Sequence, residues 1–443
     1  KPVPPGDNFC AIPLLASLSD FTVAAPGAEI EYRDEEARDR FLEMQLPDPG
    51  NGIEMPKLPD LADSRGIELD AWAAYFRQAE GFDTGDATAP SGVQIRNAFT
   101  RFDAGIDEIA AAAASRPQGW FPVKLGNSFM ETISAPFPHL SDLIQFSRFL
   151  TVKGGAAAAG GDAATARKCV QIQLRLAEAV GAEPLLLFHL VEISMVNQAA
   201  AVIREGLLAR SWSEDDLEWL SSRLAEVDLY ERSANALRGE MTGFFLAGTR
   251  FLKSANSREW RMLTGVSGNS SGIREKVAYR LLPDGWLDHS AAIGCDLLYR
   301  RGILPLKTQE FSGLADDWLD RDSKSSTPYH FLVNLLLPAT ESLVKRTVRT
   351  QVLLDAARVA CALESYHLRN RAYPDSLEAL APEYLPSIPQ DPITGGPLLF
   401  KKNENGYRIY SVGLNKKDDG GISVGRGGQT RGDWVFACDR DAS

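Results

Sequence analysis

The sequence predicts a mainly α protein, in which antiparallel helix pairs form a bundle or a short solenoid, with a small α+β domain at the carboxyl end. From Leu69 to about Leu252, apolar residues recur at helical spacing. Short turns separate these helical stretches, which favours antiparallel neighbours. After Thr340 a long helical pattern is followed by two strand patterns that flank Asn405-Gly406, a strong hairpin signal.

Residues 1–69 are predicted to form an extended arm packed on the body. The segment 1–5 must be extended, because proline fixes φ and restricts the residue before it. A short helix is expected around Glu35 to Met44. The apolar residues that would anchor the arm are Phe9, Ile12, Leu14, Leu15 and Phe21.

Residues 70–330 are predicted to form a helical domain. Asp70, Asp162 and Ser213 are good N-cap residues, and Asp216 would complete a capping box with Ser213. Polar stretches at 254–272 and 320–328 are interpreted as a loop and a hinge. The expected helices cover residues 71–76, 95–114, 140–159, 163–180, 184–208 and the stretch after Ser213, and helices resume over 273–301.

The composition limits the classes of partner. The formal net charge is -12 and no dense run of lysine or arginine occurs. Nucleic-acid binders usually carry a basic patch, so nucleic acid is not expected as a partner. An acidic surface also argues against direct binding to anionic lipid headgroups. The five cysteines are far apart, so the chain has no CxxC metal or redox motif.

No run of 18 apolar residues is present to span a bilayer. The most apolar stretch, Pro184 to Ile203, is interrupted by His189, Glu192 and Asn197, so it is predicted to be a buried helix of a soluble domain. The chain begins at Lys1, and a signal or anchor that preceded it stays open as a hypothesis.

The carboxyl-terminal region, residues 340–443, has its own pattern. Apolar residues between Val348 and Tyr366 fall on one face of a long helix. Asp375 is expected to cap a short helix, with Glu378 as its capping-box partner. The strands are expected at 398–402 and 407–412 around the Asn405-Gly406 turn, and a last strand at 434–437.

The order of motifs in this region resembles the soluble head of the major pseudopilin of type II secretion. The motifs are a long helix, an Ala-Tyr-Pro-Asp-Ser-Leu-Glu-Ala-Leu turn at 372–380, Pro389-Gln390-Asp391-Pro392, and Tyr-Ser-Val-Gly-Leu-Asn at 410–415. The chain also resembles uncharacterised bacterial envelope proteins that join such a tail to a helical region. In those proteins an arm like Lys1 to Phe9 follows a membrane anchor.

Two departures from the family change what the resemblance implies. More than 300 residues precede the long helix, and the amino-terminal part of this helix, Lys345 to Arg349, is charged. The hydrophobic helix that builds a pseudopilin fibre is therefore not at the start of this chain. The resemblance then implies a docking module rather than a fibre subunit. The segment Ala156 to Leu208 resembles a tetratricopeptide-like hairpin, with ordinary bundle packing as an equal alternative.

The resemblance also implies a metal site, because the matching loop of the family binds calcium. The matching residues here are Asn415, Asp418, Asp419 and Asp433, whose oxygens suit calcium. Lys416 and Lys417 add positive charge to the loop and argue against the metal. The alternative is a glycine-rich loop held by Asx turns, with Asp433 bonded to backbone N–H groups.

No catalytic motif stands out. The five histidines are far apart, and the chain lacks HExxH, GxSxG, Walker and dinucleotide-binding patterns. His189 lies in an apolar helix and is interpreted as a core residue. A helical hydrolase acting on glycans would need two carboxylates across a cleft, and spacing alone cannot choose them among Glu178, Glu183, Glu192 and Glu205.

These observations favour a non-enzymatic binding or scaffold protein of the cell envelope, associated with secretion. Its helical body would supply a concave surface, and its pseudopilin-like head would dock to a protein partner. The resemblance places it on the extracytoplasmic side, anchored through a segment before Lys1. No catalytic residue or organic cofactor is predicted, and calcium is the one metal considered. The alternative is a helical envelope hydrolase that acts on glycans through paired carboxylates.

Overall fold

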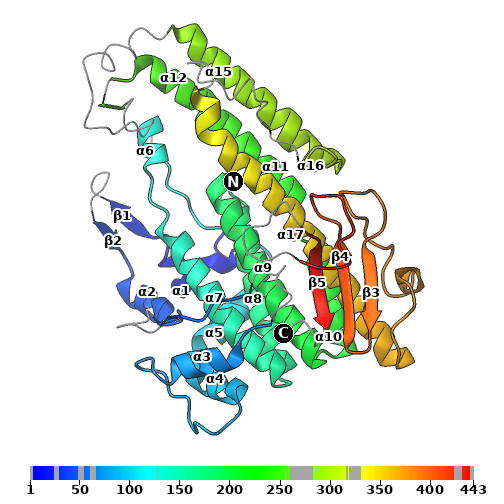
Figure 1. Ribbon diagram of the computed structural model, residues 1–443. Coiled ribbons are helices and arrows are strands. Elements are labelled where there is room, and N and C mark those ends of the chain that lie inside the picture. The colour runs from blue at the N-terminus through cyan, green and yellow to red at the C-terminus, as the bar shows by residue number, and fades with distance from the viewer. Residues whose placement is uncertain are drawn as a thin grey trace.

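Helix α9 (Leu186–Ala209) runs through the helical body in this computed structural model of the chain (Figure 1). The structure describes residues 3–23, 29–47, 54–59, 66–126, 128–256, 258–259, 283–315, 318, 331–423 and 432–439. Four helices pack against α9, so this part of the chain forms a bundle. They are α7 (Pro138–Ala159), α8 (Ala163–Gly181), α11 (Leu229–Glu240) and α17 (Phe331–Asn370). The predicted mainly α fold with a small α+β part at the carboxyl end is confirmed.

The turns between these helices follow the capping signals in the sequence. Gly161 adopts φ 81°, a left-handed conformation that suits glycine at a helix end. The Asp162 carboxylate then accepts the backbone N–H of Thr165 at 3.1 Å and starts α8. Ser213 and Asp216 form the predicted capping box at the start of α10 (Glu214–Ala225). Short connections of this kind bring consecutive helices together as neighbours.

Helix α9 is the most apolar of the long helices. Among the described residues, it is the helix that is long and apolar enough to cross a membrane, which is weak evidence for a span. Within the protein 67% of its most apolar window is buried. Phe188, Val196 and Leu207 are among its buried side chains. The interpretation of this stretch as a buried helix is confirmed.

The amino-terminal arm has more regular structure than predicted. All five predicted anchors are buried, from Phe9 to Phe21. Strands β1 (Phe21–Val23) and β2 (Ile30–Tyr32) form a small antiparallel sheet that the sequence did not predict, because three-residue strands are too short to show alternation. The arm also contains the short helices α1 (Pro13–Ala16) and α2 (Glu35–Leu42).

Two predictions for the next segment were wrong. Helix α3 (Leu69–Phe76) begins before Asp70, and the Asp70 carboxylate instead accepts the Ser91 hydroxyl at 2.6 Å. The single helix expected over 95–114 is two helices joined by a tighter turn. These are α4 (Ser91–Phe99) and α5 (Asp103–Ser115). The break lets Phe99 and Phe102 both pack on Phe149 of α7, with ring centroids 4.5 and 5.3 Å away.

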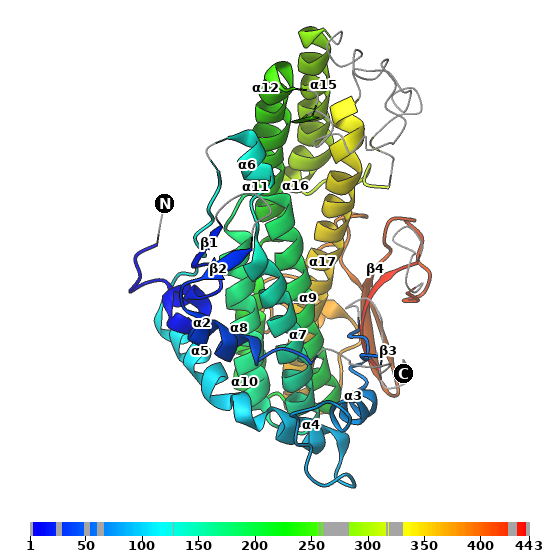
Figure 2. The same cartoon turned by 90° about the vertical axis from the view of Figure 1, so that its left-hand side faces the viewer.

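A second group of helices extends the bundle at one end (Figure 2). π-helical turns connect α11 to α12 and α15 to α16, at Met241–Leu246 and Leu298–Ile303. The helices of this group are α6 (Phe129–Ile133), α12 (Ala247–Ser254), α15 (Asp284–Leu297) and α16 (Leu304–Thr308). Most of the predicted loop at 254–272 and the whole predicted hinge at 320–328 lie outside the described residues.

The carboxyl-terminal sheet packs against the second half of α17 (Figure 2). Its order is β3-β4-β5, all antiparallel, and the Asn405-Gly406 turn joins the first two strands as predicted. Tyr407 is fully buried and donates its hydroxyl to the Ala360 carbonyl of α17 at 3.3 Å. The strand bounds are Leu399–Asn403, Gly406–Ser411 and Trp434–Asp439.

Helix α17 is shared between the two regions that the sequence separates near residue 340. Its first half packs on α11 and α15, and its second half packs on α10 and the sheet. Buried residues of both regions belong to one continuous core. The predicted cap of the following short helix was wrong: the 3₁₀ turn Leu377–Leu380 begins after Ser376, and Asp375 is exposed and pairs with Lys402 at 2.5 Å.

Candidate functional site

A cavity of about 560 Å³ lies where the arm crosses the faces of α7, α9 and α17. Helix α9 supplies the floor. Leu190, Ile193, Ser194, Asn197 and Gln198 line the cavity at three- and four-residue spacing, which places them on one helix face. The rest of the lining comes from Leu46 and the arm segment Met55–Pro59, from Trp72 of α3, and from residues of α7 and α17. Cavities of this size accommodate small-molecule ligands.

The charged side chains that line this cavity are all cationic. They are Arg148 of α7, Arg346 and Arg349 of α17, and Lys57 of the arm, and none of the described lining residues is acidic. Lys57 has a partner outside the lining, since its Nζ lies 3.6 Å from the exposed carboxylate of Glu54. Arg148 and Arg346 are exposed and have no ion-pair partner within the part of the chain that the structure describes.

The floor also carries buried polar atoms without partners. Asn197 donates its Nδ2 to Thr350 Oγ1 at 3.3 Å, and Gln198 donates its Nε2 to Ser194 Oγ at 3.2 Å. The carbonyl oxygens of both amides, Asn197 Oδ1 and Gln198 Oε1, are buried and accept no hydrogen bond from the described residues. The indole N–H of Trp72, which is also buried, donates none within the same described ranges. Buried polar groups are seldom left unsatisfied in this way.

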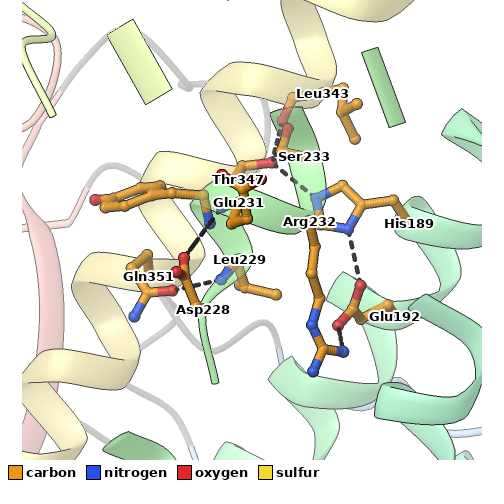
Figure 3. Close-up of polar contacts among 11 residues, drawn as sticks. His189, Glu192, Asp228, Leu229, Glu231, Arg232, Ser233, Leu343, Thr347 and Gln351 are labelled. Carbon is orange, nitrogen blue, oxygen red and sulfur yellow. Dashed lines mark hydrogen bonds and ion pairs between the residues drawn. The ribbon is translucent and has the colours of Figure 1, made fainter. Parts of the chain in front are cut away.

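A network of buried polar side chains lies on other faces of the same helices (Figure 3). His189 Nδ1 lies 2.9 Å from Glu192 Oε2, and the other carboxylate oxygen pairs with the Arg232 guanidinium from α11. His189 Nε2 lies 3.4 Å from the Thr347 hydroxyl of α17, which is 3.2 Å from the Ser233 hydroxyl of α11. The interpretation of His189 as a satisfied core residue is confirmed.

This network holds the cationic wall of the cavity in place. Thr347 is adjacent in sequence to Arg346, and Gln351 of the same helix accepts the backbone N–H of Leu229 at 3.0 Å (Figure 3). These contacts set the position of α17 against α9 and α11. The network fixes which face of α17 is turned to the cavity.

The order hydroxyl, imidazole, carboxylate in this network is also the order of a hydrolytic triad. The side chains of Ser233, Thr347 and Glu192 are all fully buried. Neither hydroxyl lines the cavity of about 560 Å³ or either of two smaller cavities among the described residues. The arrangement therefore serves packing and hydrogen bonding, because a triad needs a nucleophile that substrate can reach.

The four carboxylates considered for glycan hydrolysis all have protein partners. Glu178 pairs with Arg175 at 2.8 Å, and Glu183 accepts the Trp120 indole N–H at 2.9 Å. Glu205 accepts the backbone N–H of Ile67 at 2.8 Å, and burial raises the pKa of its carboxyl.

The structure brings two of these four carboxylates together. Glu178 and Glu192 line a small cavity of about 40 Å³. This space is large enough for a water molecule but too small for a sugar ring.

The four predicted calcium ligands lie together in the loop between β4 and β5. Asp433 Oδ1 and Oδ2 accept the backbone N–H groups of Asp419 and Gly421 at 3.2 and 2.7 Å. Asp418 Oδ1 accepts the Gly420 N–H at 2.8 Å, and Asn415 Nδ2 donates to Asp419 Oδ2 at 2.7 Å. These are the contacts that the hydrogen-bonded-loop alternative predicts.

Within the described residues, no group of three or more acidic, histidine or cysteine side chains is placed to hold a metal ion. Residues 424–431 of this loop lie outside the described residues. The calcium prediction therefore rests on the family resemblance.

Comparison with known proteins does not assign the chain to a family. No protein-family model, no curated protein and no solved structure matches the chain. The pseudopilin and tetratricopeptide resemblances rest on the sequence motifs alone.

The sequence reasoning missed the cationic cavity, although part of its signal was visible. Arg346 and Arg349 are one helical turn apart, and Asn197 interrupts an otherwise apolar helix. Arg148 and Lys57 are far from both in sequence. Their convergence depends on how three helices and the arm pack, which spacing does not reveal.

Proposed function

We propose that the protein is a non-enzymatic binding protein of the cell envelope, whose helical body holds a small anionic ligand in the cavity between α7, α9 and α17. The observation that carries this proposal is the charge of the lining. Arg148, Arg346, Arg349 and Lys57 converge on one cavity without an acidic residue among its described lining. The chain as a whole has a net charge of -12, so this local excess of positive charge is not a property of the average surface.

The physical chemistry of arginine supports an anion in this place. A guanidinium group offers a planar fork of N–H donors that matches a carboxylate or a phosphate in two parallel hydrogen bonds. Like charges that share a cavity repel one another, and an anion between them relieves that repulsion. A cavity with low-dielectric walls also concentrates counter-ions of opposite sign.

The carboxyl-terminal sheet is proposed as a docking module for a protein partner of the envelope, on the strength of the family resemblance. Helix α17 connects the proposed anion site with the proposed docking module. Its residues Arg346 and Arg349 line the cavity, and its second half packs against the sheet. An anchor before Lys1 belongs to the same proposal. Fractionation of the full-length gene product tests it, and recovery in the cytosol would contradict it.

Calorimetric titration of the full chain tests the binding function. Phosphate, citrate and a hexose phosphate should bind, and neutral or cationic molecules of similar size should not. Arg148→Ala and Arg346→Ala should each weaken anion binding at least tenfold, because each removes a charge-assisted contact worth about 1.5–3 kcal/mol.

Arg250→Ala is the matched control, since Arg250 is an exposed arginine on α12 outside the cavity. This variant should bind anions as the parent chain does. Equal loss in all three variants, or no loss in any, would contradict the proposal.

A further inference from the structure

The unpartnered polar atoms beside the cavity limit the kind of anion that fits it. Asn197 Oδ1 and Gln198 Oε1 are acceptors, and Trp72 Nε1 is a donor. All three side chains line the cavity, and none of these atoms has a hydrogen-bond partner within the described ranges. Trp72 is fully buried. A ligand that suits the cavity would offer hydrogen-bond donors to the two amides.

A carboxylate or a fully ionised phosphate monoester without hydroxyl groups cannot meet these requirements. The oxygens of either group accept hydrogen bonds and donate none. It would therefore satisfy the arginines but leave both amide oxygens unpaired. A hydroxyl group both donates and accepts. The terminal torsions of Asn and Gln are broad, so rotation about them can turn either amide oxygen toward the cavity.

The positions of these groups divide the cavity into two parts. Asn197 and Gln198 lie on the α9 floor, next to Ser194, which also carries a hydroxyl. Arg148 comes from α7 and Arg346 from α17, and both of these helices pack on α9. A row of amide and hydroxyl side chains beside guanidinium groups therefore offers hydroxyl recognition on the floor and anion recognition at the walls.

From this arrangement we infer that the ligand is a hydroxylated anion, that is, a sugar or polyol that carries a phosphate or carboxylate group. The inference rests on the proposed anion-binding function and adds the chemical class of the ligand. The anionic group lies between Arg148 and Arg346, and the hydroxyl groups donate to Asn197 and Gln198. A volume of about 560 Å³ accommodates a molecule of this kind.

Four probe molecules distinguish the inference of a hydroxylated anion from the more general proposal of anion binding. Glucose 6-phosphate represents hexose phosphates, and glucuronate represents sugar acids. Hexyl phosphate carries the same anion without hydroxyl groups, and glucose carries the hydroxyl groups without the anion. Calorimetry on the full chain should show that the better of the two sugar anions binds at least tenfold more tightly than hexyl phosphate, and that glucose binds more weakly still.

The outcomes of this titration are distinguishable. If hexyl phosphate binds as tightly as both sugar anions, the hydroxylated ligand is ruled out and the anion-binding function stands. If none of the anions binds, the proposed function fails as well.

Substitution of the floor amides gives the second test. Gln198→Leu and Asn197→Leu keep the approximate side-chain volume and remove the amide. Each should weaken the better sugar anion at least tenfold and change hexyl phosphate binding less than twofold. Asn370→Leu, at the exposed end of α17, is the control and should change neither. Equal weakening of both probes by Gln198→Leu would show general damage to the cavity and would overturn the inference.

Discussion

Two faces of helix α9 carry polar side chains, and the two sets of side chains differ in whether their hydrogen-bonding groups have partners within the described residues. On one face His189 and Glu192 are buried, and their partners come from α11 and α17 (Figure 3). On the other face Asn197 and Gln198 border an open cavity, and each keeps a carbonyl oxygen without a partner among the described residues. Two of the arginines beside that cavity share this property, since Arg148 and Arg346 have no ion-pair partner within the described chain.

The difference separates groups that stabilise the protein from groups available to a ligand. A buried polar network contributes when every member is paired, and losing one member is costly because the others stay buried. Exposed cations around a cavity contribute little to stability. The two faces should therefore respond in opposite ways to substitution, one in unfolding and the other in binding.

The largest effect is expected from the buried face. Glu192→Ala leaves the Arg232 guanidinium and the His189 imidazole without their shared partner. We expect a loss of about 3–5 kcal/mol in the free energy of unfolding, as for other broken buried pairs. Chemical denaturation of the purified chain measures it. Glu226→Ala, which removes the exposed partner of Arg223, is the control and should cost about 1 kcal/mol or less. Similar losses in both variants would contradict the contrast between faces.

A second buried histidine, His139, shows what the absence of a hydrogen-bond partner should do to stability as the pH changes. His139 is buried among Phe121, Phe137 and Phe188, and neither ring nitrogen has a partner within the described residues. Burial lowers its pKa from 6.5 to about 4. The unfolded chain therefore binds a proton at higher pH than the folded chain does. Stability should be complete above pH 6.5 and fall as the pH is lowered toward 4, by on the order of 3 kcal/mol.

Denaturation curves at several pH values test this expectation. His139→Leu should flatten the dependence between pH 6.5 and 4, while the part due to other groups remains. An unchanged pH dependence in this variant would show that His139 is protonated as easily in the folded chain as in the unfolded chain.

The open face should show the opposite response. Arg346→Ala should change the free energy of unfolding by no more than about 0.5 kcal/mol, as for most exposed positions. The same variant should lose about 1.5–3 kcal/mol of anion-binding free energy. Thermal denaturation and calorimetry on one preparation give both values. A variant that loses stability and keeps binding would reverse the assignment of the two faces.

In the loop of the carboxyl-terminal sheet, where the polar groups are paired locally, the expected loss of stability is smaller than that of Glu192→Ala. Asp433→Ala removes the acceptor of two backbone N–H groups and should cost about 1–2 kcal/mol. A melting curve with and without calcium tests the metal prediction at the same site. If Asn415, Asp418, Asp419 and Asp433 bind calcium, the parent chain melts higher with calcium and the variant does not. A loop held by hydrogen bonds alone shows no calcium-dependent shift.

The helices were predictable because their signals are local. The Ser213–Asp216 capping box, the Gly161-Asp162 turn and the Asn405-Gly406 hairpin each depend on a few consecutive residues, and the structure confirms all three. Predictions failed where distant contacts decided the outcome. Asp70 was expected to cap a helix, but its carboxylate instead accepts a hydrogen bond from the hydroxyl of Ser91, which is distant in sequence. The helix expected over 95–114 breaks because two of its phenylalanines pack on the same ring of α7.

By itself the sequence determined the helical fold, the hairpin near the carboxyl end and the burial of the apolar α9 helix, because periodicity and capping act over a few residues. Tertiary structure alone decided that α17 serves both the helical body and the sheet. It also decided that Arg148, Arg346 and Lys57, which are far apart in the chain, line one cavity. These cationic side chains meet only because of how the helices and the arm pack. That packing depends on contacts between residues far apart in the chain, which local sequence patterns do not reveal.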